Sequence, residues 1–216
     1  ALHNVMKYPT LSDSAFAKCG EVTVQVVRIS DDGIVREYAA ACLFNLAQQS
    51  MRGMTSLADD TMAILPKLIA DENPLTQYFA ISTAGDLFFM KGTDPQHLQT
   101  LIEGVIAKGS VLKDVDAIEG LLVALAKLSQ DDFSMNILET NALFPGMLNL
   151  LLNLQQKVDT YLANKTVGIA LCRISLRMGP EALDQAVRVR IASALTGILD
   201  KATNLQVLGN TIAAIR

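Results

Sequence analysis

The chain has 216 residues and a formal net charge of −4; half of its residues are apolar, 19% are charged, 5% are aromatic and none is Trp. This composition excludes a disordered tail and supplies enough apolar side chains for a core without a disulfide or metal. Residues 1–132 carry 10 basic and 17 acidic side chains, whereas residues 133–216 carry 8 and 5.

The basic residues of the second part are sparse, and nucleic-acid binding modules show a dense basic stripe instead. We therefore expect no nucleic-acid partner. These dispersed residues are Lys157, Lys165, Arg173, Arg177, Arg188 and Arg190.

The cysteines and histidines are too few and too far apart for a disulfide framework or a metal site. The cysteines stand at positions 19, 42 and 172, and the histidines at 3 and 97. We expect neither a metal nor any other cofactor, and a reducing compartment such as the cytoplasm.

The longest apolar stretch, residues 142–154, has 13 residues. A membrane span needs about 20 residues, and the beginning of the chain lacks the pattern of a secretory signal. We therefore expect no membrane span.

Helical patterns repeat along the chain at a nearly constant step, which is typical of a helical solenoid. The clearest copy covers residues 31–47, DDGIVREYAAACLFNLA, in which Val35, Ala39, Leu43 and Leu46 lie at helical spacing. The same register recurs at steps of 41, 41, 41, 46 and 41 residues, at Val5, Leu46, Leu87, Leu128, Ile174 and Ile215.

Shorter signals predict the other helices of each unit. Residues 63–69 and 142–148 share one pattern with a proline, which we place near a helix start because its missing N–H costs least there. Residues 31–33 and 71–74 have the composition of a capping turn before a long helix. Each unit is therefore predicted to contain two helices, a tight turn and a third helix.

These registers predict a single solenoid over residues 1–216, built from repeats of about 41 residues. Because neither end shows the polar capping repeat that a solenoid needs, we expect an internal piece of a longer array or complex; the alternative is a self-contained short array with frayed ends. The predicted boundaries are 1–8 for the tail of a preceding repeat, 9–48, 49–89, 90–130 and 131–176 for repeats, and 177–216 for a truncated last repeat.

Three segments resemble the armadillo (ARM/HEAT-like) repeat superfamily: FAKCGEVTVQVVRISDDGIVREYAAACLFNLA, ILPKLIADENPLTQYFAISTAGDL, and ILETNALFPGMLNLLLN followed by VGIALCRIS. The resemblance covers essentially the whole chain, and the copy at residues 98–129 is also similar to a HEAT repeat. It implies an all-α, right-handed superhelix of three-helix repeats.

No motif of a catalytic centre is present in the sequence. Acidic pairs occur, but they lie at repeat boundaries, where carboxylates stabilise helix N-termini through the unpaired N–H groups. We therefore expect no enzyme activity. The pairs are Asp31/Asp32, Asp59/Asp60, Asp71/Glu72 and Asp131/Asp132.

The resemblance also implies a concave groove lined by the third helices, where an Asn holds the backbone of an extended partner. The positions that match this Asn are Asn4, Asn45, Asp86, Lys127, Arg173 and Ala214. An Asn amide can pair with any peptide bond because it both donates and accepts. The absence of Trp argues against the binding of nuclear-localisation peptides in the manner of importin-alpha.

Charge and aromatic residues could add specificity to such a groove. The change from Asp86 to Lys127 and Arg173 favours a partner with the reverse order of charges. Tyr38, Phe79 and Phe89 lie one or two turns from the groove positions. They are either apolar anchors for a partner or packing residues between neighbouring third helices.

Two hypotheses for function remain from the sequence. The first is a non-enzymatic scaffold that binds an extended segment of another protein in the groove. The second is a structural subunit of a large cytoskeletal assembly, such as a ciliary or flagellar axoneme, which contacts neighbouring subunits through its edges and convex face.

Overall fold

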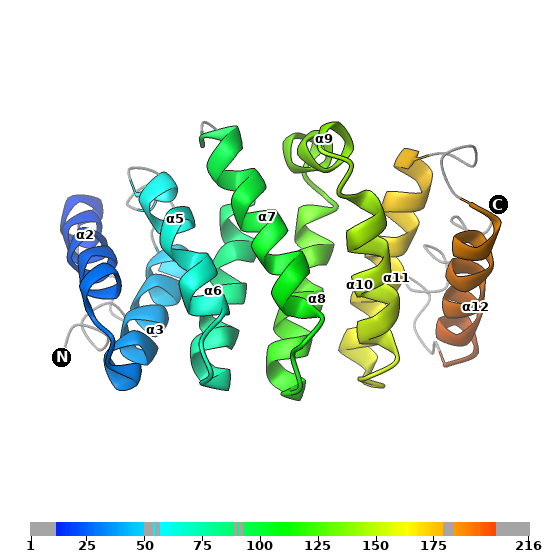
Figure 1. Cartoon of the computed structure of the whole chain (residues 1–216), viewed down its shortest axis with the longest axis horizontal. Coiled ribbons are helices and arrows are strands. Elements are labelled where there is room, and N and C mark those ends of the chain that lie inside the picture. Colours follow the sequence, from blue (N-terminus) through cyan, green and yellow to red (C-terminus); the bar gives the residue numbers. More distant parts are fainter. Residues whose placement is uncertain are drawn as a thin grey trace. The chain divides into compact units, whose positions relative to one another are not determined.

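The computed structural model of the chain (Figure 1) contains helices and no strand in the residues that it describes. The chain divides into two compact units, Ala1–Ala124 and Leu125–Arg216. The residues described are 12–49, 54, 57–88, 90, 93–178 and 184–201.

The first unit is built from two layers of helices. Helices α2, α5 and α7 form one layer, because α5 packs against both α2 and α7; α3 and α6 pack together in the other (Figure 1). The layers are joined by contacts of α2 with α3 and of α5 with α6. The helices are α2 (Asp13–Ile29), α3 (Gly33–Gln49), α5 (Ala58–Ile69), α6 (Pro74–Leu87), α7 (Pro95–Gly109) and residues 115–124 of α8 (Val115–Leu128).

The second unit contains the rest of α8 and four further helices. Helix α11 packs against α10 and α12, and α10 and α12 also touch each other. The four helices are α9 (Asp132–Thr140), α10 (Phe144–Gln155), α11 (Tyr161–Met178) and α12 (Gln185–Lys201).

Short polar side chains begin most of these helices. The Asp32 carboxylate accepts a hydrogen bond from the backbone N–H of Ile34 at 2.8 Å, and Asn73 accepts one from Leu75 at 2.9 Å. Such bonds satisfy N–H groups that have no partner within the helix. The same role is played by Asp94, Asp114, Asp131, Thr160 and Asp184.

The prediction of a proline near a helix start is right for one segment and wrong for the other. Pro145 lies in the first turn of α10. Pro66 lies inside α5, because that helix begins at Ala58. Leu57 precedes helix α5, and Asp59 and Asp60 lie in its first turn. A glycine of α7 faces the ring, since a Cβ at Gly104 would lie 3.6 Å from Pro66.

The number of helices in each predicted unit differs along the chain. Residues 131–176 contain three helices, α9, α10 and α11, as the sequence predicts. The described residues of 90–130 contain two, α7 and α8, which is the arrangement of the HEAT-like copy. The repeat boundaries themselves stay predictions.

The anchor positions of the repeat lie in the core. Leu46 and Leu87 in the first unit are 0% exposed, and so are Leu128 and Ile174 in the second. Val5 and Ile215 lie outside the described residues. The 41-residue step therefore identified buried positions in both units.

One acidic residue of the predicted capping turns has a different role. Asp71 is buried, and its carboxylate accepts hydrogen bonds from Arg36 Nε at 2.5 Å and from the backbone N–H of Asn73 at 3.0 Å. The hydrogen bond from Arg36 to Asp71 raises the pKa of the Arg36 guanidinium. This ion pair ties the start of α3 to the α5–α6 turn.

Candidate functional site

The residues of the predicted groove register lie on the long helices of the two units. In the first unit, Asn45 on α3 and Asp86 on α6 are half-buried. In the second unit, Lys127 on α8 is half-buried and Arg173 on α11 is exposed. The register therefore marks partly accessible positions. Asn4 and Phe89 lie outside the described residues.

In the first unit, a side-chain hydrogen bond connects the two helices that carry Asn45 and Asp86. Gln48 of α3 donates from its amide to the carboxylate of Asp86 on α6. The two residues are 38 positions apart in the sequence, close to one repeat step. Asn45 and Asp86 each take part in further interactions. A partner that binds at these two residues would therefore have to join or displace interactions that they already make.

The aromatic residues of this unit separate into two situations. Phe79 lies 5.5 Å from Phe44 and 5.6 Å from Tyr78 between ring centroids, so it packs between α3 and α6. Tyr78 also approaches α8, because a Cβ at Gly120 would lie 3.2 Å from its ring. Tyr38 is 59% exposed. Phe79 therefore packs against the rings of Phe44 and Tyr78, whereas Tyr38 is accessible; a role of either residue as a partner anchor stays a prediction.

In the second unit, Arg177 of α11 is held by three acceptors of α9. Its Nη1 lies 3.1 Å from Asp132 Oδ1 and its Nε lies 3.6 Å from Glu139 Oε2, while Nη2 donates to Asn136. The acceptors are spaced i, i+4 and i+7, which places them on one face of the helix. Sequence reasoning did not identify this contact, although the polar stripe on α9 was a visible signal.

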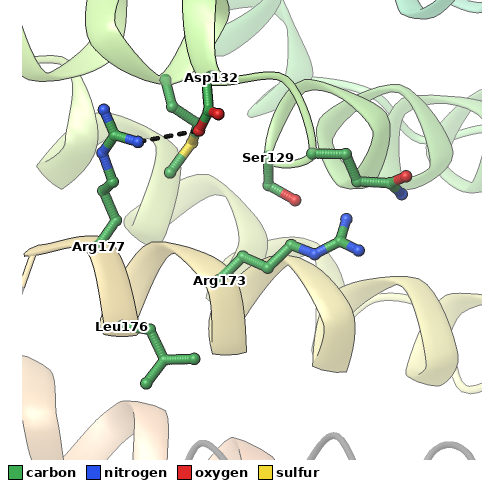
Figure 2. Close-up of a pocket in the computed structure, with 7 residues that line it drawn as sticks. Ser129, Asp132, Arg173, Leu176 and Arg177 are labelled. Atoms are coloured by element: carbon green, nitrogen blue, oxygen red, sulfur yellow. Dashed lines mark hydrogen bonds and ion pairs between the residues drawn. The ribbon is translucent and has the colours of Figure 1, made fainter.

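An open hollow of about 440 Å³ lies beside these residues. Figure 2 shows Arg177 turned to Asp132, while the Arg173 side chain extends along the other side of the hollow, on the side of Ser129. Among the residues that the structure describes, the side chain of Arg173 makes no hydrogen bond or ion pair. The lining consists of Ser129, Gln130, Asp132, Met135, Arg173, Leu176 and Arg177.

The lining combines polar and apolar groups. Ser129 donates its hydroxyl to the carbonyl of Ala126 at 2.7 Å, which leaves its oxygen able to accept. Gln130 is exposed and its amide can both donate and accept. Leu176 is 66% exposed and Met135 is 3% exposed. The hollow can therefore contact an apolar side chain and hydrogen-bond a polar chain.

The cysteines do not provide a nucleophile in the core. Burial raises the pKa of the Cys42 thiol to about 11, and it does the same for Cys172. Both therefore stay protonated at neutral pH, and a thiol is a poor nucleophile in that form. Within the described ranges, no group of three or more His, Cys, Asp or Glu residues could hold a metal ion.

None of the described helices combines the length and the apolar character that crossing a bilayer requires.

No protein-family model matches the chain, and no characterised protein matches it in sequence. Solved structures do match. Two engineered proteins of the Northeast Structural Genomics Consortium have TM-scores of 0.74 and 0.75 with sequence identities of 16% and 21%. Each alignment covers 99% of this chain, and the two cover 87% and 51% of the engineered chains.

A designed armadillo repeat protein, solved in complex with the peptide (KR)4, also matches. Its TM-score is 0.68 and its identity is 17%, and the alignment covers 99% of this chain and 88% of the designed chain. Identities this low show a shared fold. The helices, their buried repeat positions and these neighbours agree with the resemblance seen in the sequence, and the chain therefore has an all-α, armadillo-like repeat fold.

Proposed function

We propose that this chain is a non-enzymatic scaffold whose units bind extended segments of a partner protein on exposed helix faces, those of α3 and α6 in the first unit and that of α11 in the second. The observation that carries the proposal is Arg173, a register residue that is exposed and lines the hollow of the second unit. A guanidinium without a hydrogen-bond partner among the described residues, next to apolar side chains, suits a polypeptide that offers acceptors and apolar groups.

The designed neighbour supports this use of the fold. That protein was solved with the peptide (KR)4 bound, so helices in this arrangement are compatible with peptide capture. The charge of the present chain favours a different cargo in the second unit. Residues 125–216 carry 9 basic and 7 acidic side chains, whereas residues 1–124 carry 9 and 15. We therefore expect the second unit to prefer acidic segments.

The first unit adds groups that suit a peptide backbone. Asn45 is half-buried and carries an amide that pairs with peptide groups whatever the partner's side chains are. The exposed ring of Tyr38 offers apolar contact on the same helix. These residues stay proposed contacts, and their contribution is measured by substitution.

The proposal is tested by fluorescence anisotropy with labelled (DE)4 and (KR)4 peptides and the whole chain. The test variant combines Asn45→Ala, Lys127→Ala and Arg173→Ala. We expect it to weaken binding of the (DE)4 peptide by about tenfold or more, which is about 1.4 kcal/mol, because the variant loses two cations.

A matched control variant removes the same residue types elsewhere. It combines Asn153→Ala, Lys157→Ala and Arg188→Ala, which are exposed and do not line the hollow. We expect this control to bind like the wild type. If neither peptide binds, or if both variants bind like the wild type, the scaffold proposal is wrong. The alternative, a structural subunit that contacts its neighbours through its edges and convex face, would then be favoured.

A further inference from the structure

We infer that the hollow between α9 and α11 is a subsite for the carboxylate of an Asp or Glu side chain in the partner segment. An apolar residue next to that acid would lie on Met135 and Leu176. The inference rests on the proposed function, and it specifies the partner's chemistry at one place: an internal acidic residue flanked by an apolar one.

The two guanidiniums of the hollow are in different states. Arg177 is fixed by Asp132, Asn136 and Glu139, and 31% of its side chain is exposed. The Arg177 side chain therefore has a fixed position at one side of the hollow, and its positive charge is already paired with carboxylates of α9. Arg173 has no such acceptor among the described residues and is exposed. It is therefore the cation that an incoming anion can pair with at the smallest cost in broken contacts.

The charges around the hollow favour an anion with a single charge. The lining contains two arginines and one carboxylate, and Glu139 next to it also pairs with Arg177. Arg173 is therefore the cation of the lining that has no carboxylate partner among the described residues, and one carboxylate would neutralise it. A phosphoryl group carries close to two negative charges at neutral pH and would lie near Asp132, whose side chain is 93% exposed. Repulsion from that carboxylate makes the phosphoryl group the weaker ligand.

The openness of the hollow favours an internal side chain over a chain terminus. Leu176 stays 66% exposed, so the lining does not close around an end. Ser129, which lies on the side to which Arg173 extends (Figure 2), and Gln130, which also lines the hollow, can hydrogen-bond a passing backbone. A segment that runs across the hollow would therefore meet backbone partners, the Arg173 guanidinium and an apolar surface in succession.

The test measures affinities of the whole chain for four labelled seven-residue peptides, each acetylated at its N-terminus. The first is amidated and has Leu-Glu-Leu at its centre. The second replaces Glu with Gln, and the third replaces Glu with phosphoserine. The fourth has no acidic side chain and ends in Leu with a free carboxylate. Each peptide is measured against the wild type, Arg173→Gln, Arg173→Lys and the control Arg188→Gln.

We expect the Glu peptide to bind the wild type about tenfold more tightly than the Gln peptide, and Arg173→Gln to abolish that difference. Arg173→Lys should restore part of it because the positive charge returns without the planar fork. Arg188→Gln should bind like the wild type. Circular dichroism of each variant establishes that it is folded.

The other outcomes overturn the inference in distinguishable ways. Equal binding of the Glu and Gln peptides, unaffected by Arg173→Gln, would refute the subsite and leave the scaffold proposal standing. If only the phosphoserine peptide or only the free carboxylate terminus depended on Arg173, the assignment to an acidic side chain would be wrong. Failure of all these peptides and of (DE)4 and (KR)4 would refute both proposals.

Discussion

Replacing Gly20 with Ala tests how tightly α2 packs in the first unit. A Cβ at this position would lie 2.3 Å from Leu57 Cδ1 and 2.8 Å from Leu46 Cδ2. Both leucines are buried, at 3% and 0% exposure. The methyl group could fit only if two core side chains moved together.

The expected size follows from two opposing effects. Ala stabilises a helix interior by about 1 kcal/mol relative to Gly. Overpacking a well-packed core costs about 1–3 kcal/mol. The variant Gly20→Ala should therefore be less stable than the wild type by about 1 kcal/mol. In Gly104→Ala, the new Cβ would lie 3.6 Å from Pro66, which is an ordinary contact, so this control should gain up to about 1 kcal/mol.

The assay is urea unfolding of the wild type and both variants, followed by circular dichroism. Both glycines belong to the first unit, so the same transition reports on both. We expect the urea midpoint to fall in Gly20→Ala and to rise in Gly104→Ala. If Gly20→Ala were as stable as Gly104→Ala, the close packing of α2 against Leu57 and Leu46 would be refuted.

Three further predictions concern the buried ion pair and the thiols. Asp71→Ala should lower the free energy of unfolding by about 2 kcal/mol, because it removes a buried carboxylate that accepts from Arg36 and from the backbone N–H of Asn73. Asp31→Ala removes a fully exposed carboxylate 3.9 Å from Lys67 and should have little effect; urea unfolding compares the two variants, and equal effects would contradict the pairing. Iodoacetamide at pH 8 should modify half-exposed Cys19 before buried Cys42 and Cys172. Mass spectrometry measures the order of alkylation, and earlier modification of Cys42 or Cys172 would contradict their burial. Folding raises the pKa of each buried thiol from 9.0 to about 11, so the unfolded chain loses these protons at lower pH than the folded chain does. The contribution of the two thiols to the free energy of unfolding should therefore be complete below pH 9 and decline as the pH rises to 11. Urea midpoints that stay constant over this pH range would contradict this expectation.

The repeat step predicted the core because burial is set by local periodicity. Leu46 and Leu87 stand at the same position of successive units, and the stacking of like helices buries both. Helix starts were also accessible from sequence, since Asp32 and Asn73 cap through bonds to residues two positions away. Such signals lie within a few residues and need no knowledge of tertiary contacts.

Side-chain contacts between helices could not be predicted in the same way. Arg36 and Asp71 are 35 positions apart, and Arg177 and Asn136 are 41 apart. Their pairing depends on how two helices pack, so a capping role for Asp71 was the simpler local interpretation. The register identified Arg173, but the hollow beside it appears only when α9 is placed against α11. Several polar residues lie about one repeat step from each arginine, and only the packing of the two helices decides which of them becomes its hydrogen-bond partner.

Binding of a partner segment at the α9–α11 hollow should protect the backbone around it. Hydrogen exchange of the whole chain, followed by mass spectrometry with and without a saturating Leu-Glu-Leu peptide, measures this protection. We expect slower exchange in residues 129–140 and 173–178 when the peptide is bound. Peptide binding without protection in these segments, or with protection confined to α12, would refute binding at the hollow.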